Sequence, residues 1–376
     1  MPLISPLVSA LTWQEAASDA GLLDAWRALA TRAPAENALH SAPEWVEHYA
    51  GKSAPGVAVL VARTPGGAIA GVVPTVRLSF VLGRGRRSGG LPLSKLTVAC
   101  VLGSAPLLDG GVPVADVIEG ALASLPDCDA LYFDSLPADN PCAALFAPGA
   151  TAGRFLPHRL STGRLHSLVL GSSYDDYLAQ RPARSRFKLK RAARLLEARG
   201  TLELVRCDAP EGLDDFLREA VTVYERSWHA KSGAELGGNH ARYRRELFDL
   251  AQRGWLRCYL LRCGDSACAF AIGYQAHGVY HYQEIAHDEA FAALSPGTVL
   301  FLRLLEDLHS VERPAILDFG VGDDGYKRRF GTRARPVVSG LLFRPARRNR
   351  LRIGAHRLIE GAKGLAFAVR QRGRRP

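Results

Sequence analysis

The feature that most constrains the fold is a run of three β-rich segments in the second half of the chain. They are residues 255–263 (WLRCYLLRC), 267–277 (ACAFAIGYQAH) and 278–287 (GVYHYQEIAH). Because so few residues connect them, they predict an antiparallel three-strand meander. Helical periodicity precedes the meander near residues 211–230 and 239–253 and follows it at residues 298–310. This part of the chain therefore predicts a mixed α/β domain.

The flanking segments extend this pattern and suggest a second domain. In the second half they predict strands at residues 165–170, 201–207, 315–320 and 335–343, and a helix at about 174–199. The first half predicts helices at 20–33, 41–49 and 113–125, and strands at 56–63, 68–78, 95–103 and 129–137. A chain of 376 residues is long enough for two domains. We expect domains at residues 1–160 and 161–343 and a tail at 344–376.

Composition and motifs exclude several classes of protein. The chain is 47% hydrophobic and 23% charged, which is typical of a soluble globular protein. It contains no run of 18 apolar residues and no basic segment at its start, so we expect a cytoplasmic protein. Its seven cysteines form no C-x-x-C pair and predict reduced, buried thiols. Hydrolase, nucleotide-binding and zinc motifs are absent from the sequence, so no metal is expected.

The net charge of +11 is concentrated in the tail. Residues 341–376 hold 11 basic side chains and one acidic side chain. Apolar residues recur there at spacings of three and four: Leu351, Ala355, Leu358, Ala362, Leu365 and Val369. This pattern predicts a basic amphipathic helix, which suits an anionic membrane surface and a peripheral location at its inner face. Three glycines in the same segment favour a loosely packed or disordered tail equally.

A glycine pattern at residues 316–332 has the spacing of a dinucleotide-binding fingerprint. Gly320-x-Gly322-x-x-Gly325 follows an apolar run, but Gly331 and Pro336 are expected to prevent a helix after it. No acidic residue lies between Asp324 and Glu360 to bind a ribose. We therefore interpret this segment as an anion-binding loop on the substrate side and reject a dinucleotide site.

Four short motifs occur in an order that resembles a known family. They are HSAPEWVEHY (residues 40–49), RSRFKLKRAARLLEARG (184–200), ALSPGTVLFLRLLEDL (293–308) and LDFGVGDDGYKRRFG (317–331). Together they resemble the CelD-like proteins of bacterial cellulose biosynthesis, a family related to the GNAT acyltransferases and distantly similar to the Fem-type peptidyltransferases. The resemblance covers roughly residues 10–343. The element order of the second half is also similar to that of the GNAT fold.

The resemblance implies a tandem double GNAT fold, with mixed central sheets flanked by helices. It also implies that the second copy binds the acyl donor, an acyl-CoA such as acetyl-CoA. Two positions depart from the family. The usual phenylalanine of the first motif is Leu39 or His40, and the Q/R-x-x-G-x-G/A phosphate loop of simple GNAT enzymes is missing.

The donor site is expected at the start of the helix that begins near residue 296. Ser295 caps this helix, Pro296 suits its first position, and Gly297 and Thr298 give a ligand access to backbone and hydroxyl donors. The basic helix adds Arg184, Lys188 and Arg191 on one side. Such a face would attract the 3′-phosphate of CoA, a diphosphate acceptor or the acceptor stem of a tRNA.

Acyl transfer needs a base for the acceptor and a proton for the leaving thiolate. Asp318 and Glu284 are the candidate bases. His281, an odd number of positions from Glu284, is expected on the opposite face of its strand and is assigned to substrate binding. Lys327 would neutralise a phosphate or an oxyanion, Tyr326 would protonate the thiolate, and Trp228 would line the acceptor site.

The sequence therefore predicts an acyltransferase that moves an acyl group from acyl-CoA to an amine or hydroxyl of a sugar, nucleotide-sugar or polysaccharide precursor. Attack is expected to be direct, since no covalent nucleophile constellation is present. One alternative is a Fem-like enzyme that takes an aminoacyl group from tRNA. Another is a non-catalytic accessory protein of exopolysaccharide assembly.

Overall fold

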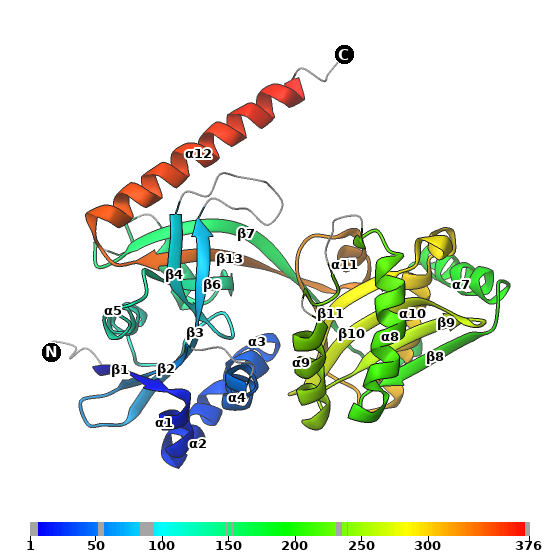
Figure 1. Cartoon of the computed structure of the whole chain (residues 1–376), viewed down its shortest axis with the longest axis horizontal. Helices are drawn as coiled ribbons and strands as arrows, with labels where there is room; N and C mark the ends of the chain where they lie inside the picture. The colour runs from blue at the N-terminus through cyan, green and yellow to red at the C-terminus, as the bar shows by residue number, and fades with distance from the viewer. Residues whose placement is uncertain are drawn as a thin grey trace. The chain divides into compact units, whose positions relative to one another are not determined.

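The computed structural model describes residues 7–51, 56–82, 94–147, 149–151, 153–230, 235–238 and 240–372. The chain forms two compact units (Figure 1). Unit 1 extends to Gly163 and resumes at Arg335, and unit 2 is Arg164–Ala334. The residues from 335 to 343, grouped with the second domain by the sequence-based boundaries, thus belong to unit 1 by their contacts.

Unit 1 is built on a mixed sheet with the strand order β1-β2-β3-β4-β6-β13. The strands are β1 (Leu7–Thr12), β2 (Val57–Arg63), β3 (Ile69–Leu82), β4 (Ser94–Val101), β6 (Ala130–Pro137) and β13 (Arg333–Phe343), and the short β5 (Leu107–Leu108) pairs with β3. The β4–β6 pair is parallel, and the pairs β1–β2, β2–β3, β3–β4 and β6–β13 are antiparallel.

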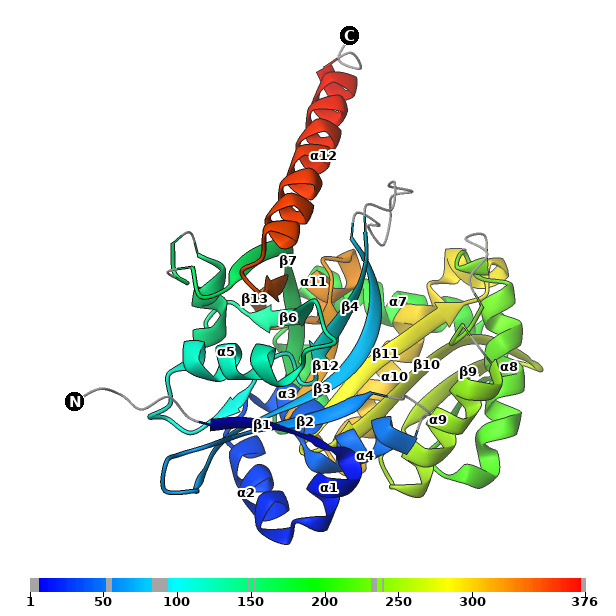
Figure 2. The ribbon, with the colours of Figure 1, turned by 60° about the vertical axis from the view of Figure 1, so that its left-hand side comes forward.

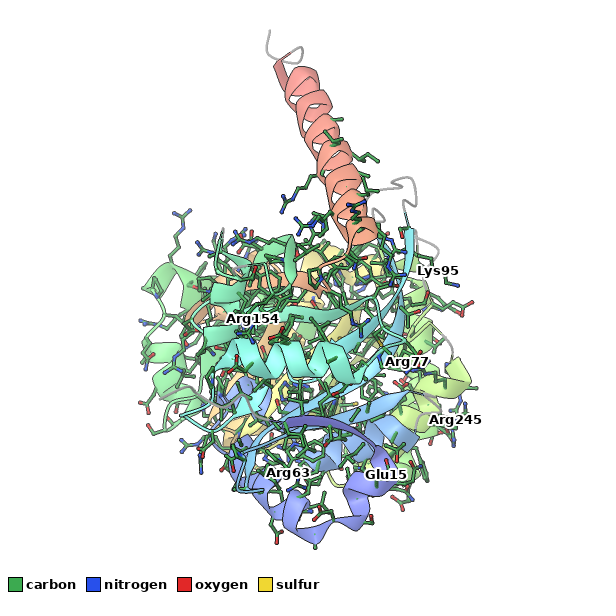
Figure 3. The ribbon with its side chains drawn as sticks, turned by 90° about the vertical axis from the view of Figure 1, so that its left-hand side faces the viewer. Glu15, Arg63, Arg77, Lys95, Arg154 and Arg245 are labelled. Carbon is green, nitrogen blue, oxygen red and sulfur yellow. The ribbon has the colours of Figure 1, made fainter. Side chains whose placement is uncertain are left out.

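The helices that flank this sheet are α1 (Trp13–Ser18), α2 (Ala20–Ala30), α3 (Ala35–Ser41), α4 (Pro43–Gly51), α5 (Val114–Ser124) and the 3₁₀ helix η1 (Pro141–Phe146). α12 (Arg347–Arg372) starts against the sheet, where Ile353 shares a core with Leu82 and Val98, and then extends away from it (Figure 1). The apolar stripe predicted for residues 20–33 is buried in α2, where Asp19 accepts a hydrogen bond from Leu22 N–H at 2.9 Å. Such a side-chain cap satisfies a free donor of the first turn. Outside the sheet, Arg154 donates to Asp116 of α5 at 2.7 Å (Figure 3).

Unit 2 contains the predicted meander. β9 (Cys258–Cys263), β10 (Ser266–Ala276) and β11 (Val279–His287) pair antiparallel in sequence order, with β8 (Leu202–Cys207) at one edge. On the other side, β11 pairs parallel with β12 (Ile316–Val321), which pairs with the end of β7 (Leu156–Val169). The predicted antiparallel three-strand meander is confirmed.

Helices cover both faces of the unit 2 sheet. They are α6 (Tyr174–Ala179), α7 (Ala183–Glu197), α8 (Leu213–Glu225), α9 (His240–Gln252), α10 (Pro296–Ser310), α11 (Gly325–Phe330) and the 3₁₀ helices η2 (Pro210–Gly212) and η4 (Glu289–Leu294). α7 and α10 share one core with Tyr280 and Tyr282 of β11. α8 and α9 lie on the other face (Figures 1 and 2).

The helices of the structure differ from the sequence predictions at three places. The helix expected at about 174–199 is two helices, because Pro182 adopts an extended conformation (ψ 144°) before α7. A short helix, α11, does follow the glycine pattern, and it ends at Gly331, whose N–H bonds to Lys327 O at 2.8 Å. The seven-residue α3 before the Pro43 helix was not predicted.

The described part of the tail forms a helix, α12, which agrees with the predicted basic helix and not with the alternative of a disordered tail. The start of α12 is fixed to unit 1, since Arg352 donates to Asp129 at 2.8 Å and Ile353 is buried. Further along, Leu351 and Leu358 are 73% and 77% exposed. Within the described residues, no helix combines the length and apolarity needed to cross a bilayer.

Candidate active site

The candidate site in unit 2 lies where β11 and β12 stop pairing. Their parallel register joins Val279 to Ile316 and ends with His281 opposite Asp318. Both strands continue beyond this pair, β11 to His287 and β12 to Val321, but each then pairs only with its outer neighbour in the described structure. The two strands therefore form no backbone pairing with each other beyond His281 and Asp318, as expected for strands that separate.

A β-bulge puts Glu284 on the same face of β11 as His281. The register with β10 jumps between Ile272, opposite Glu284, and Gly273, opposite Tyr282, so β11 holds one extra residue. Ile285 consequently packs in the same core as Tyr282, three positions away. The prediction that His281 and Glu284 face opposite sides is therefore wrong, because strict alternation fails at a bulge.

His281 and Asp318 form a buried pair on this face. His281 Nδ1 lies 3.3 Å from Asp318 Oδ2, and the two residues are 0% and 5% exposed. Asp318 Oδ1 also accepts a hydrogen bond from Gly320 N–H at 2.8 Å, and the ring of Tyr274 contacts the imidazole with centroids 4.9 Å apart. A carboxylate held in this way fixes the orientation of a histidine ring. Asp318 is thus better placed to position His281 than to act as the base.

Glu284 is the carboxylate best suited to accept a proton. It is half-buried, and this burial raises its pKa above the ordinary value. The Tyr243 hydroxyl of α9 donates a hydrogen bond to it, and burial keeps the pKa of Tyr243 well above its usual range, so this phenol stays protonated. A carboxylate with a raised pKa is a stronger general base than an exposed one.

A glycine before α9 makes room for Tyr243. A Cβ at Gly237 would lie 2.2 Å from Tyr243 Cγ, and the φ of Gly237 is +67°. Sequence reasoning did not identify Gly237 or Tyr243, although the Gly237-Gly238 pair before a helical segment marks a special turn.

Replacing Gly237 by alanine is expected to destabilise the chain more than replacing Gly238 by alanine. Both glycines have left-handed φ values, +67° and +70°, but a Cβ at Gly238 meets no atom within 4 Å. Gly238→Ala should therefore cost about 1 kcal/mol from the backbone alone, whereas Gly237→Ala adds a steric clash and should cost about 3 kcal/mol. Urea unfolding of the two variants measures the difference. Equal free energies of unfolding for the two variants would show that Gly237 does not position Tyr243.

An aromatic stack flanks the same face of β11. Trp228 is 56% exposed and stacks on His229, with centroids 3.8 Å apart, and His229 stacks on Tyr224 at 5.4 Å. The His229 ring also hydrogen-bonds to the backbone of Ile285, next to Glu284. The expected substrate residue Trp228 therefore presents an anchored, solvent-facing ring, which suits contact with a sugar or another ring.

The start of α10 is open to solvent. Ser295 occupies the N-cap position with φ +54°, is exposed and makes no capping hydrogen bond with its side chain, contrary to its expected role as a cap. Gly297 and Thr298 are half-buried. The end of β11 lies next to them, since a Cβ on Gly297 would be 3.8 Å from His287 Nδ1. Pro296 has no N–H and the Thr298 N–H bonds to Ser295 O at 3.0 Å, so the first turn offers an anion the Gly297 N–H, the Thr298 hydroxyl and the positive end of the helix dipole.

The basic residues predicted on α7 are available for ligands. Arg184, Lys188 and Arg191 are exposed and form no ion pair within the described part of the chain. The same helix buries its apolar side, where Leu189 and Leu196 are 6% and 0% exposed. α7 packs against α10 and against η4, the turn that leads into α10. Arg184, Lys188 and Arg191 therefore lie on a helix that packs next to the start of α10.

The loop after β12 uses its charges internally. Lys327 is buried, donates to Val321 O at 2.8 Å and lies 3.8 Å from Asp324, and burial lowers its pKa. Asp323 pairs with Arg328 at 2.9 Å. The expected anion-binding lysine thus closes the β12–α11 turn in this structure.

Tyr326 lies on the α10 side of the sheet. Its half-buried ring contacts Phe319 and Tyr282, with centroids 6.0 and 6.5 Å apart. Burial raises its pKa, so the hydroxyl keeps its proton. The candidate proton donor Tyr326 and the candidate base Glu284 therefore lie on opposite faces of the strands that separate.

No metal centre was expected, and the described residues contain no group of three or more His, Cys, Asp or Glu side chains that could hold a metal ion. Six free cysteines are buried in the part of the chain that the structure describes: Cys128, Cys142, Cys207, Cys258, Cys263 and Cys268. Burial raises the pKa of Cys142 to about 12. Thiolate chemistry is therefore not favoured at that residue.

Comparisons with known proteins agree with this architecture. Residues 183–328 match the family described as "Acetyltransferase (GNAT) domain". No curated protein matches the chain. Among solved structures, FemX has a TM-score of 0.59 at 13% identity, covering 90% of this chain and 97% of FemX.

A second solved structure is a tandem GNAT protein from the clavulanic acid biosynthesis pathway. Its TM-score is 0.53 at 17% identity, and the match covers 91% of this chain and 99% of that protein. At such identities the similarity concerns the fold alone. The chain therefore has a tandem GNAT fold, with a GNAT acetyltransferase domain at residues 183–328.

Proposed function

We propose that this chain transfers an acyl group from acyl-CoA to an amine or hydroxyl of a sugar, nucleotide-sugar or polysaccharide precursor. This proposal is supported most by β11, along which the pairing with β12 ends at His281 and Asp318 and whose far end, at His287, lies next to the open start of α10. The donor diphosphate binds the first turn of α10 through Gly297, Thr298 and Ser295, and Arg191 contributes charge from α7. The thioester then enters between the diverging strands.

The reaction needs two proton transfers, and the two faces of the sheet supply them. The acceptor nitrogen or oxygen attacks the thioester carbonyl while Glu284 takes its proton. The carbon–sulfur bond then breaks, and the leaving thiolate takes the proton of Tyr326. Asp318 positions His281, which is fully buried and supports the site from behind, and Trp228 contacts the ring of the acceptor. Lys327 keeps the β12–α11 turn closed around this site.

A donor and acceptor screen tests this function. Purified protein is incubated with acetyl-CoA and longer acyl-CoA esters, each with amino sugars or nucleotide-sugars, and release of the free CoA thiol is followed. Acceptor-dependent thiol release is expected for at least one pair. Thiol release that never depends on an acceptor, or no release with any pair, would instead favour the accessory role in exopolysaccharide assembly.

A Fem-like reaction with aminoacyl-tRNA is the second candidate. The observation in its favour is the row of exposed cations Arg184, Lys188 and Arg191, which would suit a nucleic acid. Binding of tRNA through such residues should weaken steeply with salt. Aminoacyl transfer from charged tRNA, with salt-dependent binding and no acyl-CoA turnover, would replace the first proposal.

We further propose that α12 brings the enzyme to an anionic membrane surface, where a cellulose-like or other exopolysaccharide precursor would be made. The exposed Leu351 and Leu358 lie seven residues apart on one face of this basic helix. Replacing both by aspartate should lower binding to phosphatidylglycerol vesicles by roughly 10²-fold or more, because two buried leucines contribute about 3 kcal/mol or more.

Vesicle co-sedimentation measures this effect, and acyl transfer to a water-soluble acceptor should stay unchanged. Leu195→Asp on α7, where the leucine is 41% exposed, is the control. Truncation before residue 344 is a poorer test, since Arg344 donates to Cys128 O at 2.6 Å and to the carbonyls of Leu122 and Leu125. Equal vesicle binding by wild type and the double variant would exclude α12 as the anchor.

A further inference from the structure

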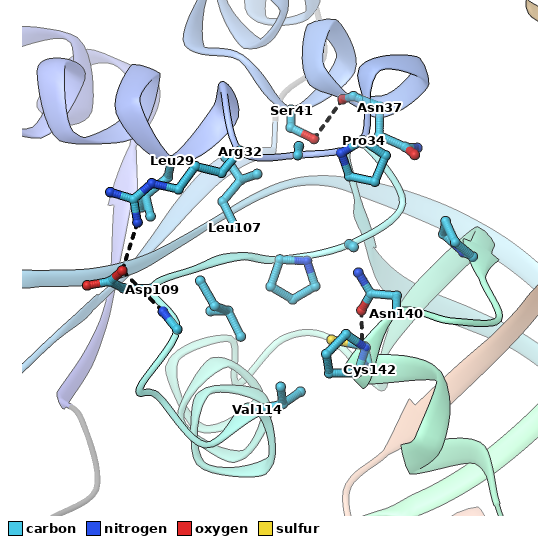
Figure 4. A pocket seen from close by; sticks show the side chains of 18 of the residues that line it. Leu29, Arg32, Pro34, Asn37, Ser41, Leu107, Asp109, Val114, Asn140 and Cys142 are labelled. Atoms are coloured by element: carbon cyan, nitrogen blue, oxygen red, sulfur yellow. Dashed lines mark hydrogen bonds and ion pairs between the residues drawn. The ribbon is translucent and has the colours of Figure 1, made fainter.

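Unit 1 contains a cavity that none of the predicted site residues lines. Its volume is about 340 Å³, which is in the range of small-molecule sites. It is enclosed by the α2–α3 turn and α3, by the loop between β4 and α5, and by the segment that follows β6 (Figure 4). All of these elements belong to unit 1, so the cavity is a feature of that unit alone.

The walls of this cavity are mostly aliphatic. Four prolines line it, together with leucines, valines and alanines, and no aromatic side chain is among the lining residues. A ligand that needs ring stacking, such as a nucleobase or a sugar, therefore finds no platform here. An aliphatic chain would find continuous apolar contact.

The charge of the cavity argues against an anionic ligand. Its only cationic side chain is Arg32, which pairs with Asp109 at 2.8 Å, and both are more than half exposed. The pair is neutral overall and lies at the solvent side of the cavity. A phosphate or diphosphate would have no free cation among the lining residues.

The polar groups that could bind a ligand in this cavity include the side-chain carboxamides of Asn37 and Asn140. The Asn37 side chain is 8% exposed and has no hydrogen-bond partner within the residues that the structure describes. Asn140 uses its Oδ1 to accept from Cys142 N–H at 2.9 Å, which leaves its NH₂ group as a donor (Figure 4). Both side chains therefore have polar groups that a ligand or water in the cavity can pair with.

The loop that forms the opposite wall is held against α3. A Cβ at Gly103 would lie 1.8 Å from Ser41 Oγ, and φ at Gly103 is +70°, so only glycine fits there. Ser41 itself is 1% exposed and donates to Asn37 O at 2.9 Å (Figure 4). The wall that carries Asn37 is thus fixed by packing as well as by hydrogen bonds, which indicates a preformed cavity.

We propose that the cavity of unit 1 binds an uncharged aliphatic amide, with Asn37 and Asn140 pairing with the amide groups and the aliphatic wall covering the chain. Carboxamides are both donors and acceptors, and so are the amides that they would bind. Two sources share this chemistry, a peptide segment and a pantetheine-like acyl carrier arm. The site is independent of the donor site proposed for unit 2.

Ligand-observed NMR titration of the full chain tests this proposal with two uncharged probes, N-acetyl-alanine N-methylamide for the peptide source and pantetheine for the carrier arm. Saturable binding of at least one probe is expected, and the tighter probe identifies the source. Failure of both amides to bind would overturn the proposal.

Asn37→Leu locates the binding. Loss of one or two neutral hydrogen bonds should weaken binding of the probe about tenfold, and a thermal midpoint close to that of wild type would show that the fold is intact. Gly297→Val in unit 2 should leave probe binding unchanged. Unchanged probe affinity in Asn37→Leu, or a loss in Gly297→Val, would place the binding elsewhere. Because the readout is probe binding, this test does not depend on acyl transfer.

Discussion

Replacing Glu284 by glutamine is expected to lower the turnover number of acyl transfer by about 10²-fold to 10⁴-fold, the usual contribution of a general base. Glutamine keeps the size of the side chain and can still accept the hydrogen bond from Tyr243, so positioning should survive while proton transfer is lost. Donor affinity should stay within about twofold of wild type. Thiol-release kinetics and donor titration measure both quantities.

The pH dependence gives this prediction a second readout. Because burial raises the pKa of Glu284, wild-type turnover should rise with pH through a value above the ordinary carboxyl range, and this limb should vanish in Glu284→Gln. The stability of the folded chain should change with pH in the opposite direction to turnover. A raised folded-state pKa stabilises the chain at low pH, and this contribution is lost as pH rises through that pKa.

Glu284→Gln should therefore melt at a higher temperature than wild type at pH 7, and the gap should close at acid pH. Glu203→Gln, on the exposed edge strand β8, is the matched control and should change neither turnover nor melting. If Glu284→Gln retains wild-type turnover with its rising limb intact, another group accepts the proton.

Replacing Gly297 by valine is expected to weaken acyl-CoA binding roughly 10²-fold. A diphosphate that accepts from the Gly297 N–H and the Thr298 hydroxyl would form two charge-assisted hydrogen bonds worth about 1.5–3 kcal/mol each. A valine side chain would occupy the space next to these donors. The fold itself should tolerate it, since the added Cβ makes only an ordinary contact with His287 at 3.8 Å.

Much of the unit 2 fold could be predicted because it depends on local patterns. The meander follows from three β-rich runs with short connections, and the buried stripe of α7 follows from the spacing of Leu189 and Leu196. The break at Pro182 could have been found from the same sequence, because the residue before a proline avoids the helical region.

Other features depend on tertiary context that a sequence pattern does not contain. The bulge in β11 changes which residues share a face, and nothing in the run from His281 to Glu284 shows an extra residue. Lys327 looks like a ligand-binding cation in the sequence, but its distance to Val321 O depends on how the chain turns after β12. The role of Tyr243 depends on a packing contact with Gly237.

Calorimetric titration of acetyl-CoA into wild type, Gly297→Val and Gly171→Val tests the central claim most directly. At Gly171, in the same unit, an added Cβ meets no atom within 4 Å, so this variant controls for a valine in open space. We predict saturable donor binding that Gly171→Val retains and Gly297→Val loses by roughly 10²-fold. Equal affinity in all three proteins, or no binding to wild type, would contradict a donor site at the start of α10.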